Sequence, residues 1–156
     1  MKPKYKQIVR RQLDATLAKF SEAGSVQSPA KGWIRAVREV LGMSGKQLAG
    51  RLKVSQPRVF KLEQDEPAGA LTLKTMRQVA EALDCVFVYA LVPRSSLEET
   101  VRTQAKVVAA ERLQRVSHTM LLEGQALSSA EQKASLYAAI EELVRETPRD
   151  LWDLQP

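Results

Sequence analysis

The stretch KQLAGRLKVSQPRVFKLE, residues 46–63, constrains the fold of this chain more than any other. Apolar residues recur at helical spacing on both sides of a short break, at Leu48, Leu52, Val59 and Leu62. Ser55 is a residue type that commonly caps a helix N-terminus. Pro57 falls in the first turn of the helix that Ser55 would cap, where a missing N–H costs nothing. The stretch therefore predicts two short helices joined by a tight turn, crossing closely at the small residue Ala49.

The neighbouring segments predict one further helix on each side of this pair. WIRAVREVLGM, from Trp33, is amphipathic, and TLKTMRQVAEALD begins at Thr72, a typical N-cap residue. This order of helices is the helix-turn-helix layout. Over residues 33–83 the chain resembles the Xre/Cro-like family of bacterial and phage repressors. One departure is Lys53, at a turn position usually held by glycine. A left-handed lysine costs on the order of 1 kcal/mol, which would favour a slightly reshaped turn.

The resemblance implies that the helix beginning at Ser55 lies in the major groove of DNA. Its exposed side chains would read base edges, a glutamine pairing with adenine and an arginine or lysine with guanine. The start of the preceding helix, capped by Ser44, would contact phosphate. The DNA-binding residues expected from the resemblance are Ser44, Lys46, Gln47, Arg51, Ser55, Gln56, Arg58 and Lys61.

Charge is unevenly distributed along the chain. Residues 1–92 carry 16 basic and 8 acidic side chains, a net charge of +8, whereas residues 93–156 carry 8 and 10, a net charge of −2. The front part is therefore the part suited to neutralising phosphates. We expect a basic N-terminal helix and linker over 1–32, a helix-turn-helix domain with a terminal strand over 33–92, and a helical region over 93–156.

The pattern changes at CVFVYALV, residues 85–92, which is rich in β-branched and aromatic residues. It predicts one short β-strand, and because both of its faces are apolar the strand should be buried. A lone strand needs a partner. That partner could be the same strand of a second chain, or the N-terminal segment could cover it. The expected fold class is mainly α, with one short strand and a C-terminal helical extension.

A second motif lies in SHTMLLEGQ, residues 117–125, near the end of a long predicted helix. Thr119 and Glu123 fall on one helix face, and Gly124 follows as a natural stop. On spacing alone this is an ordinary helix end within a dimerisation domain. The three residues also match [Ser/Thr]-x-x-x-Glu-[Gly/Asn], the inhibitory-helix motif of regulators of Fic-domain enzymes.

The whole chain resembles the family called mobile mystery protein A, from its basic N-terminal helix through GWIRAVREVLGMSGKQLAGRL, SQPRVFKLE and ALDCVFVYALVP to TMLLEGQ. That family is associated with a neighbouring Fic-domain protein, mobile mystery protein B. The resemblance implies that Glu123 pairs with an arginine of the Fic site and blocks productive ATP binding. Thr119 would help to seat the helix, and Gly124 would end it without a colliding side chain.

Several classes of function are not expected. With one cysteine and one histidine, the chain has no disulfide framework and is a poor candidate for a zinc site. It lacks a catalytic constellation, so we expect neither an enzyme nor a cofactor. No apolar run suits a membrane span, and we expect a cytoplasmic location.

These observations together predict a dimeric antitoxin that represses its own operon by binding operator DNA and inhibits a Fic-domain toxin. The first alternative is a plain dimeric Xre-family repressor, whose rear half serves dimerisation or senses an effector. The second is a structural adaptor with no DNA role.

Overall fold

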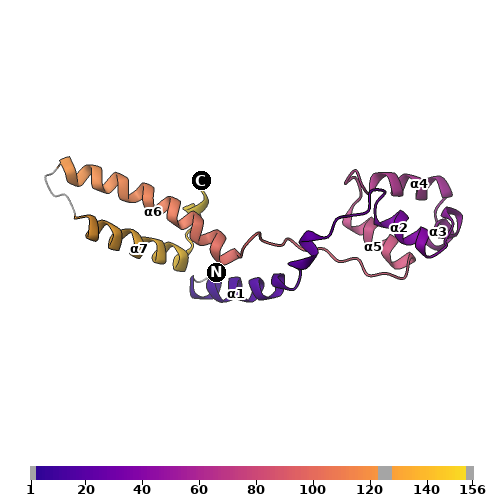
Figure 1. Cartoon of the computed structure of the whole chain (residues 1–156), viewed down its shortest axis with the longest axis horizontal. Helices are drawn as coiled ribbons and strands as arrows, with labels where there is room; N and C mark the ends of the chain where they lie inside the picture. The colour runs from indigo at the N-terminus through magenta and orange to yellow at the C-terminus, as the bar shows by residue number, and fades with distance from the viewer. Residues whose placement is uncertain (1–2, 123–127, 154–156) are drawn as a thin grey trace. The chain divides into compact units, whose positions relative to one another are not determined.

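The computed structural model describes residues 3–122 and 128–153 of the 156-residue chain. The chain folds as two compact units, one formed by residues 22–90 and the other by residues 1–21 together with 91–156. Figure 1 shows helices α2 to α5 gathered in the first unit, and α1, α6 and α7 in the second. Within the described residues, no helix is long and apolar enough to cross a membrane.

The residue 22–90 unit is built from a short 3-10 turn, η1, and four α-helices. These elements are η1 (Glu22–Ser25), α2 (Trp33–Val40), α3 (Gly45–Leu52), α4 (Gln56–Asp65) and α5 (Leu73–Ala82). All four helices contribute to one apolar core, which consists of Ile34, Leu48, Ala49, Val59, Leu62, Val79 and Leu83. The core includes Ala49 at 4 % exposure, which confirms the close crossing of two helices that the sequence predicts.

The turn between α3 and α4 keeps its usual geometry despite Lys53. This residue is the C-cap of α3 and adopts a left-handed conformation, with φ 56° and ψ 41°. The N–H of Val54 then donates to the carbonyl of Ala49 at 3.0 Å, closing the helix end. The turn is therefore not reshaped, and the lysine accepts the conformation that glycine would adopt at a lower cost.

Two polar contacts fix α4 against α2. The Arg38 guanidinium donates to both carboxylate oxygens of Glu63, at 2.5 and 3.2 Å, and to the Met43 carbonyl at 2.8 Å. One turn later, the Glu66 carboxylate accepts the first two N–H groups of α2, each at 2.8 Å. A carboxylate at a helix N-terminus satisfies free donors and suits the helix dipole. Both contacts hold the α4 helix in a fixed position within its domain.

The predicted strand at residues 85–92 is wrong: no β-strand occurs in the described residues. After α5, Asp84 adopts a left-handed conformation with φ 57°, and the Cys85 N–H donates to the Ala80 carbonyl at 2.8 Å. The residues beyond find no neighbouring strand within the described chain, and a strand requires a hydrogen-bonded partner. The segment is also not buried, since Val86 is 86 % exposed and Leu91 is 87 % exposed.

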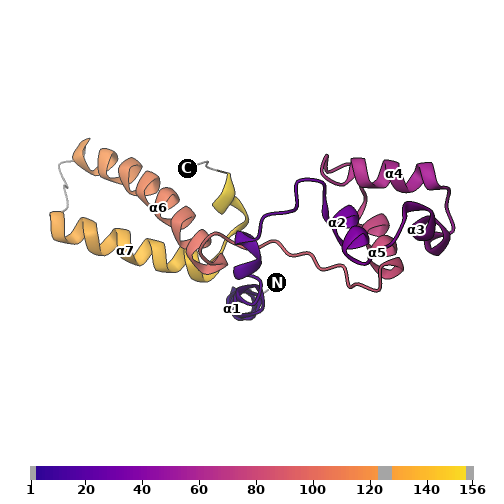
Figure 2. The same ribbon diagram turned by 45° about the vertical axis from the view of Figure 1, so that its right-hand side comes forward.

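The second unit is a bundle of three helices followed by a 3-10 turn. Its elements are α1 (Pro3–Ala18), α6 (Leu97–Leu122), α7 (Ser129–Glu146) and η2 (Arg149–Trp152). Helices α6 and α7 run side by side, as Figures 1 and 2 both show. Their core consists of Val101, Ala105, Val108, Ala109, Ile140, Leu143, Val144 and Leu151. The sequence groups α1 with the linker that follows it, whereas in the structure α1 packs against α6 and α7.

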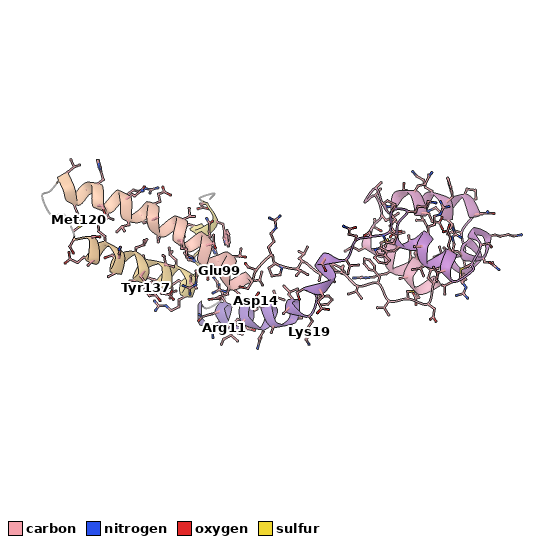
Figure 3. The ribbon with its side chains drawn as sticks, in the orientation of Figure 1. Arg11, Asp14, Lys19, Glu99, Met120 and Tyr137 are labelled. Atoms are coloured by element: carbon pink, nitrogen blue, oxygen red, sulfur yellow. The ribbon has the colours of Figure 1, made fainter. Side chains whose placement is uncertain are left out.

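Helix α1 is held by charged side chains rather than by a large apolar face. Arg10, only 8 % exposed, donates to Glu98 at 2.6 Å, to the Val144 carbonyl at 3.0 Å and to the Thr147 hydroxyl at 3.1 Å. Asp14, labelled in Figure 3, accepts the N–H groups of Leu97 and Glu98 at the start of α6. The Arg10 charge therefore stabilises this unit and is not presented to a phosphate.

Candidate nucleic-acid interface

The start of α4 is built to leave polar groups exposed. Ser55 is its N-cap, with extended backbone angles of φ −75° and ψ 154°, but the Ser55 side chain makes no capping hydrogen bond. Pro57 follows in the first turn and has no N–H to satisfy. The Ser55 hydroxyl is therefore available to an outside group such as a phosphate oxygen.

The exposed surface of α4 has two flanks and a central row. Val59, Leu62 and Glu63 are buried and define the inner face of the helix. An α-helix turns about 100° per residue, so Gln56 and Arg58 project about 200° apart, on opposite flanks. Between these flanks lie the exposed side chains of Pro57, Phe60, Lys61 and Gln64. Of these, Pro57, Lys61 and Gln64 form an outward row that points most directly away from the inner face.

The flank of α4 that carries Gln56 faces the start of α3. A Cβ added at Gly45 would lie 3.9 Å from the Gln56 Cγ, so the two helix starts are adjacent. Ser44 caps α3 through a capping box: the Gln47 N–H donates to the Ser44 hydroxyl at 3.2 Å, and the Gln47 side-chain oxygen accepts the Ser44 N–H at 2.7 Å. Lys46 is exposed beside them. The structure thus brings together four of the predicted DNA-binding residues, namely Ser44, Lys46, Gln47 and Gln56.

The opposite flank of α4 opens onto a groove between the end of α3 and α5. The groove has a volume of about 660 Å³, and Arg51, Lys53 and Arg58 line it together with Glu81. The Arg51 guanidinium donates to the Ala82 carbonyl at the end of α5, at 3.1 Å. That bond fixes the Arg51 side chain without neutralising its charge.

The surface formed by α3, the turn and α4 is strongly basic. Between Glu39 and Glu63 the sequence has no acidic residue, while five basic residues occur there: Lys46, Arg51, Lys53, Arg58 and Lys61. Within the described residues, Lys61 is the one of the five that forms an ion pair, with Asp65 at 2.8 Å. By contrast, Arg102 and Arg112 of α6 both pair with carboxylates of their own unit. The basic charge on α3 and α4 therefore remains available for an anionic partner.

The Arg38 guanidinium beneath this surface stays charged. Its hydrogen bond to Glu63 raises the pKa of the Arg38 guanidinium above its ordinary value, although burial acts in the opposite direction. Arg38 and Glu63 are 13 % and 7 % exposed. This pair lies under α4 and would not contact a ligand, so we assign it the role of positioning the helix.

Sequence reasoning missed three polar positions of this interface. Gln64 lies one turn after Lys61 in the outward row, and helical periodicity alone could have identified it. Thr75 and Gln78 of α5 line the groove beside Arg58. No sequence signal marks these two residues, because only the packing of α5 against α3 brings them there.

The second motif is described only in part. Thr119 is exposed in the last turns of α6, and its hydroxyl donates to the Arg115 carbonyl at 3.1 Å. Leu122 is 78 % exposed, and Figure 3 labels Met120 towards the end of the helix. Glu123 and Gly124 lie outside the described residues, and the role expected of Glu123 therefore stays a prediction.

Comparison with known proteins identifies the domain. A helix-turn-helix family model matches residues 34–87. No curated protein and no solved structure matched the chain. The matched residues run from α2 through α5 and include the whole basic surface of α3 and α4. Residues 34–87 form an Xre-like helix-turn-helix domain, a type of domain typical of DNA-binding transcription regulators.

Proposed function

We propose that this chain regulates transcription by binding a specific site in double-stranded DNA, with α4 in the major groove. The observation that carries the proposal is the basic surface of α3 and α4, which contains five cations and no carboxylate of its own between Glu39 and Glu63. Phosphates on either side of the groove would bind these cations, and α4 would present Gln56 and Lys61 to base edges.

A binding titration tests this proposal. Duplexes enriched from a random pool by the wild-type protein would be compared with a scrambled duplex by fluorescence anisotropy. We expect Gln56→Ala to reduce the preference for the enriched site, because a glutamine pairs with adenine through two hydrogen bonds. Binding that is weak, equal for both duplexes and insensitive to salt would support a structural adaptor instead.

The protein would act as a homodimer joined through residues 86–90. The support for this is an apolar segment with Val86 at 86 % exposure and Val88 at 61 %. A second copy of the segment could cover these apolar side chains across a two-fold axis. Val86→Asp should then yield a monomer in light scattering, whereas Val40→Asp, at an equally exposed position on α2, should leave the dimer intact.

In more detail, we propose that the regulator is an antitoxin that inhibits AMP transfer by a Fic-domain partner. The support is the match of Thr119, Glu123 and Gly124 to the inhibitory motif, in a chain that resembles mobile mystery protein A. A carboxylate held on a helix can form a bidentate pair with an arginine that would otherwise bind the γ-phosphate of ATP. The Fic enzyme would then hold ATP in an unproductive position.

An activity assay separates the antitoxin from a plain repressor. A Fic enzyme encoded beside this chain would be assayed for AMP transfer with wild-type protein, Glu123→Gly or the control Glu142→Ala on α7. The antitoxin proposal expects inhibition by the wild type and the control, and release by Glu123→Gly with binding retained. Equal inhibition by all three, or by none, would leave a plain dimeric repressor with a helical rear half.

A further inference from the structure

The two flanks of α4 face different surroundings, although the sequence suggests that Gln56 on one flank and Arg58 on the other both read base edges. Gln56 lies beside Gly45 at the start of α3, whereas Arg58 lines the groove between the end of α3 and α5. Neither residue lies in the outward row of Pro57, Lys61 and Gln64. The geometry therefore separates the residues that would face the floor of a DNA groove from those that would face its walls.

The groove beside Arg58 has the chemistry of a phosphate site. Arg51, Lys53 and Arg58 bring three cations to it, and Glu81 is the carboxylate among its described lining residues. Gln78 of α5 adds an amide that can donate hydrogen bonds, and Thr75 adds a hydroxyl that lies 2.9 Å from the Thr72 hydroxyl. Arg51 is already oriented by its bond to the Ala82 carbonyl. Cations together with uncharged donors form the usual set for a backbone phosphate.

The size of an α-helix explains why this flank would meet phosphate. The major groove is about 12 Å wide and a helix with its side chains is about 10–12 Å across, so the flanks of an inserted helix lie against the two sugar–phosphate walls. Ser44 and Lys46 would serve the wall on the side of Gln56. The cations of the second flank would serve the opposite wall.

We propose that Arg58, with Arg51 and Lys53, binds a phosphate of the DNA backbone and does not read a base. This inference rests on the proposed DNA-binding function. Base discrimination then falls to the outward row and to Gln56, whose uncharged amide projects from the first turn of α4 and can reach base edges beside its wall. Helix α5 gains a role in binding, since Thr75 and Gln78 complete the phosphate site.

The test compares Arg58→Ala and Lys53→Ala with Gln56→Ala on the enriched and scrambled duplexes over a tenfold range of salt. The slope of log K against log salt is negative, and losing one phosphate contact makes it less steep by about 0.9. Over a tenfold rise in salt, the affinity of the variant therefore falls by a factor about eightfold smaller than that of the wild type. We expect this change for Arg58→Ala and Lys53→Ala, with an unchanged ratio between the two duplexes. Gln56→Ala should show the opposite pattern, with the wild-type slope and a reduced ratio.

The Arg58 side chain is exposed and makes no hydrogen bond within the described residues, so Arg58→Ala should fold normally. Urea unfolding followed by Trp33 fluorescence in a Trp152→Phe background would verify this. A wild-type salt slope with a reduced duplex ratio for Arg58→Ala would overturn the inference while leaving the proposed function in place. Failure of the wild-type protein to bind DNA would overturn the proposed function, and the inference with it.

Discussion

Removing the carboxylate of Glu63 should destabilise the residue 22–90 unit by about 3 kcal/mol. In the wild-type protein this carboxylate accepts two hydrogen bonds from Arg38, at 2.5 and 3.2 Å, with the two side chains 7 % and 13 % exposed. The variant Glu63→Ala leaves the guanidinium charged and largely buried, with one hydrogen bond to the Met43 carbonyl and the half-exposed Glu39 carboxylate 3.8 Å away. A buried charge that has lost its main partner is the chief source of the cost.

The magnitude follows from the burial of the pair. Breaking a buried ion pair by removing one partner costs about 3–5 kcal/mol, and the lower end applies here because Arg38 keeps a carbonyl partner and some contact with solvent. Replacing both residues with methionine removes the charge together with its partner. We therefore expect Arg38→Met, Glu63→Met to cost less than Glu63→Ala alone.

Each unit contains one tryptophan, Trp33 in one and Trp152 in the other, so the two can be observed separately. In a Trp152→Phe background, urea unfolding followed by fluorescence reports on the residue 22–90 unit. With a urea m-value of about 1.5 kcal/mol/M, the expected loss lowers the midpoint by about 2 M.

The matched control is Glu39→Ala. Glu39 also lies near Arg38, at 3.8 Å, but it is half exposed. Exposed pairs contribute little, so its midpoint should change by less than about 0.5 M. A Glu63→Ala midpoint equal to that of the control would refute the reasoning, and so would a methionine double variant less stable than Glu63→Ala.

Two further predictions concern local structure. Gly32 has φ 80°, and a Cβ added there would lie 2.6 Å from a carboxylate oxygen of Glu66, whereas Gly42 has φ 66° and open space around it. Gly32→Ala should therefore destabilise its unit more than Gly42→Ala does. Equal urea midpoints for the two variants would contradict this. Hydrogen bonds from Ser128 hold the pKa of the Glu131 carboxyl below its ordinary value, so its contribution to stability is present at neutral pH and is lost as the pH falls through the lowered value. Glu131→Gln should therefore be less stable than wild type at pH 7 and nearly as stable as wild type at pH 2, and a difference independent of pH would contradict the assignment.

The helix-turn-helix could be predicted because its determinants are local. Spacing of Leu48 and Val59, the small Ala49 and the N-cap residue types specify two short helices before any tertiary contact forms. The capping box at Ser44 and the left-handed Lys53 lie where the family pattern implies. The basic surface follows from the same pattern. In a short amphipathic helix, residues that do not face the core of the domain must face outward.

What could not be predicted depends on contacts between distant parts of the chain. Residues 85–92 have strand composition, but a strand forms only where another strand supplies hydrogen bonds, and the described chain supplies none. Arg10 has the sequence context of a solvent-exposed basic helix. Its partners Glu98 and Thr147 lie 88 and 137 residues away, so no local pattern could place it in a buried network. The groove beside Arg58 depends in the same way on the packing of α5.

The central claim is that the surface of α3 and α4 recognises a specific DNA sequence. The most direct measurement is the dissociation constant of the wild-type protein for the duplex enriched from a random pool, compared with that for a scrambled duplex of equal length at one salt concentration. The account predicts that the enriched duplex binds at least about 1,000-fold more tightly. Equal dissociation constants for the two duplexes would contradict it.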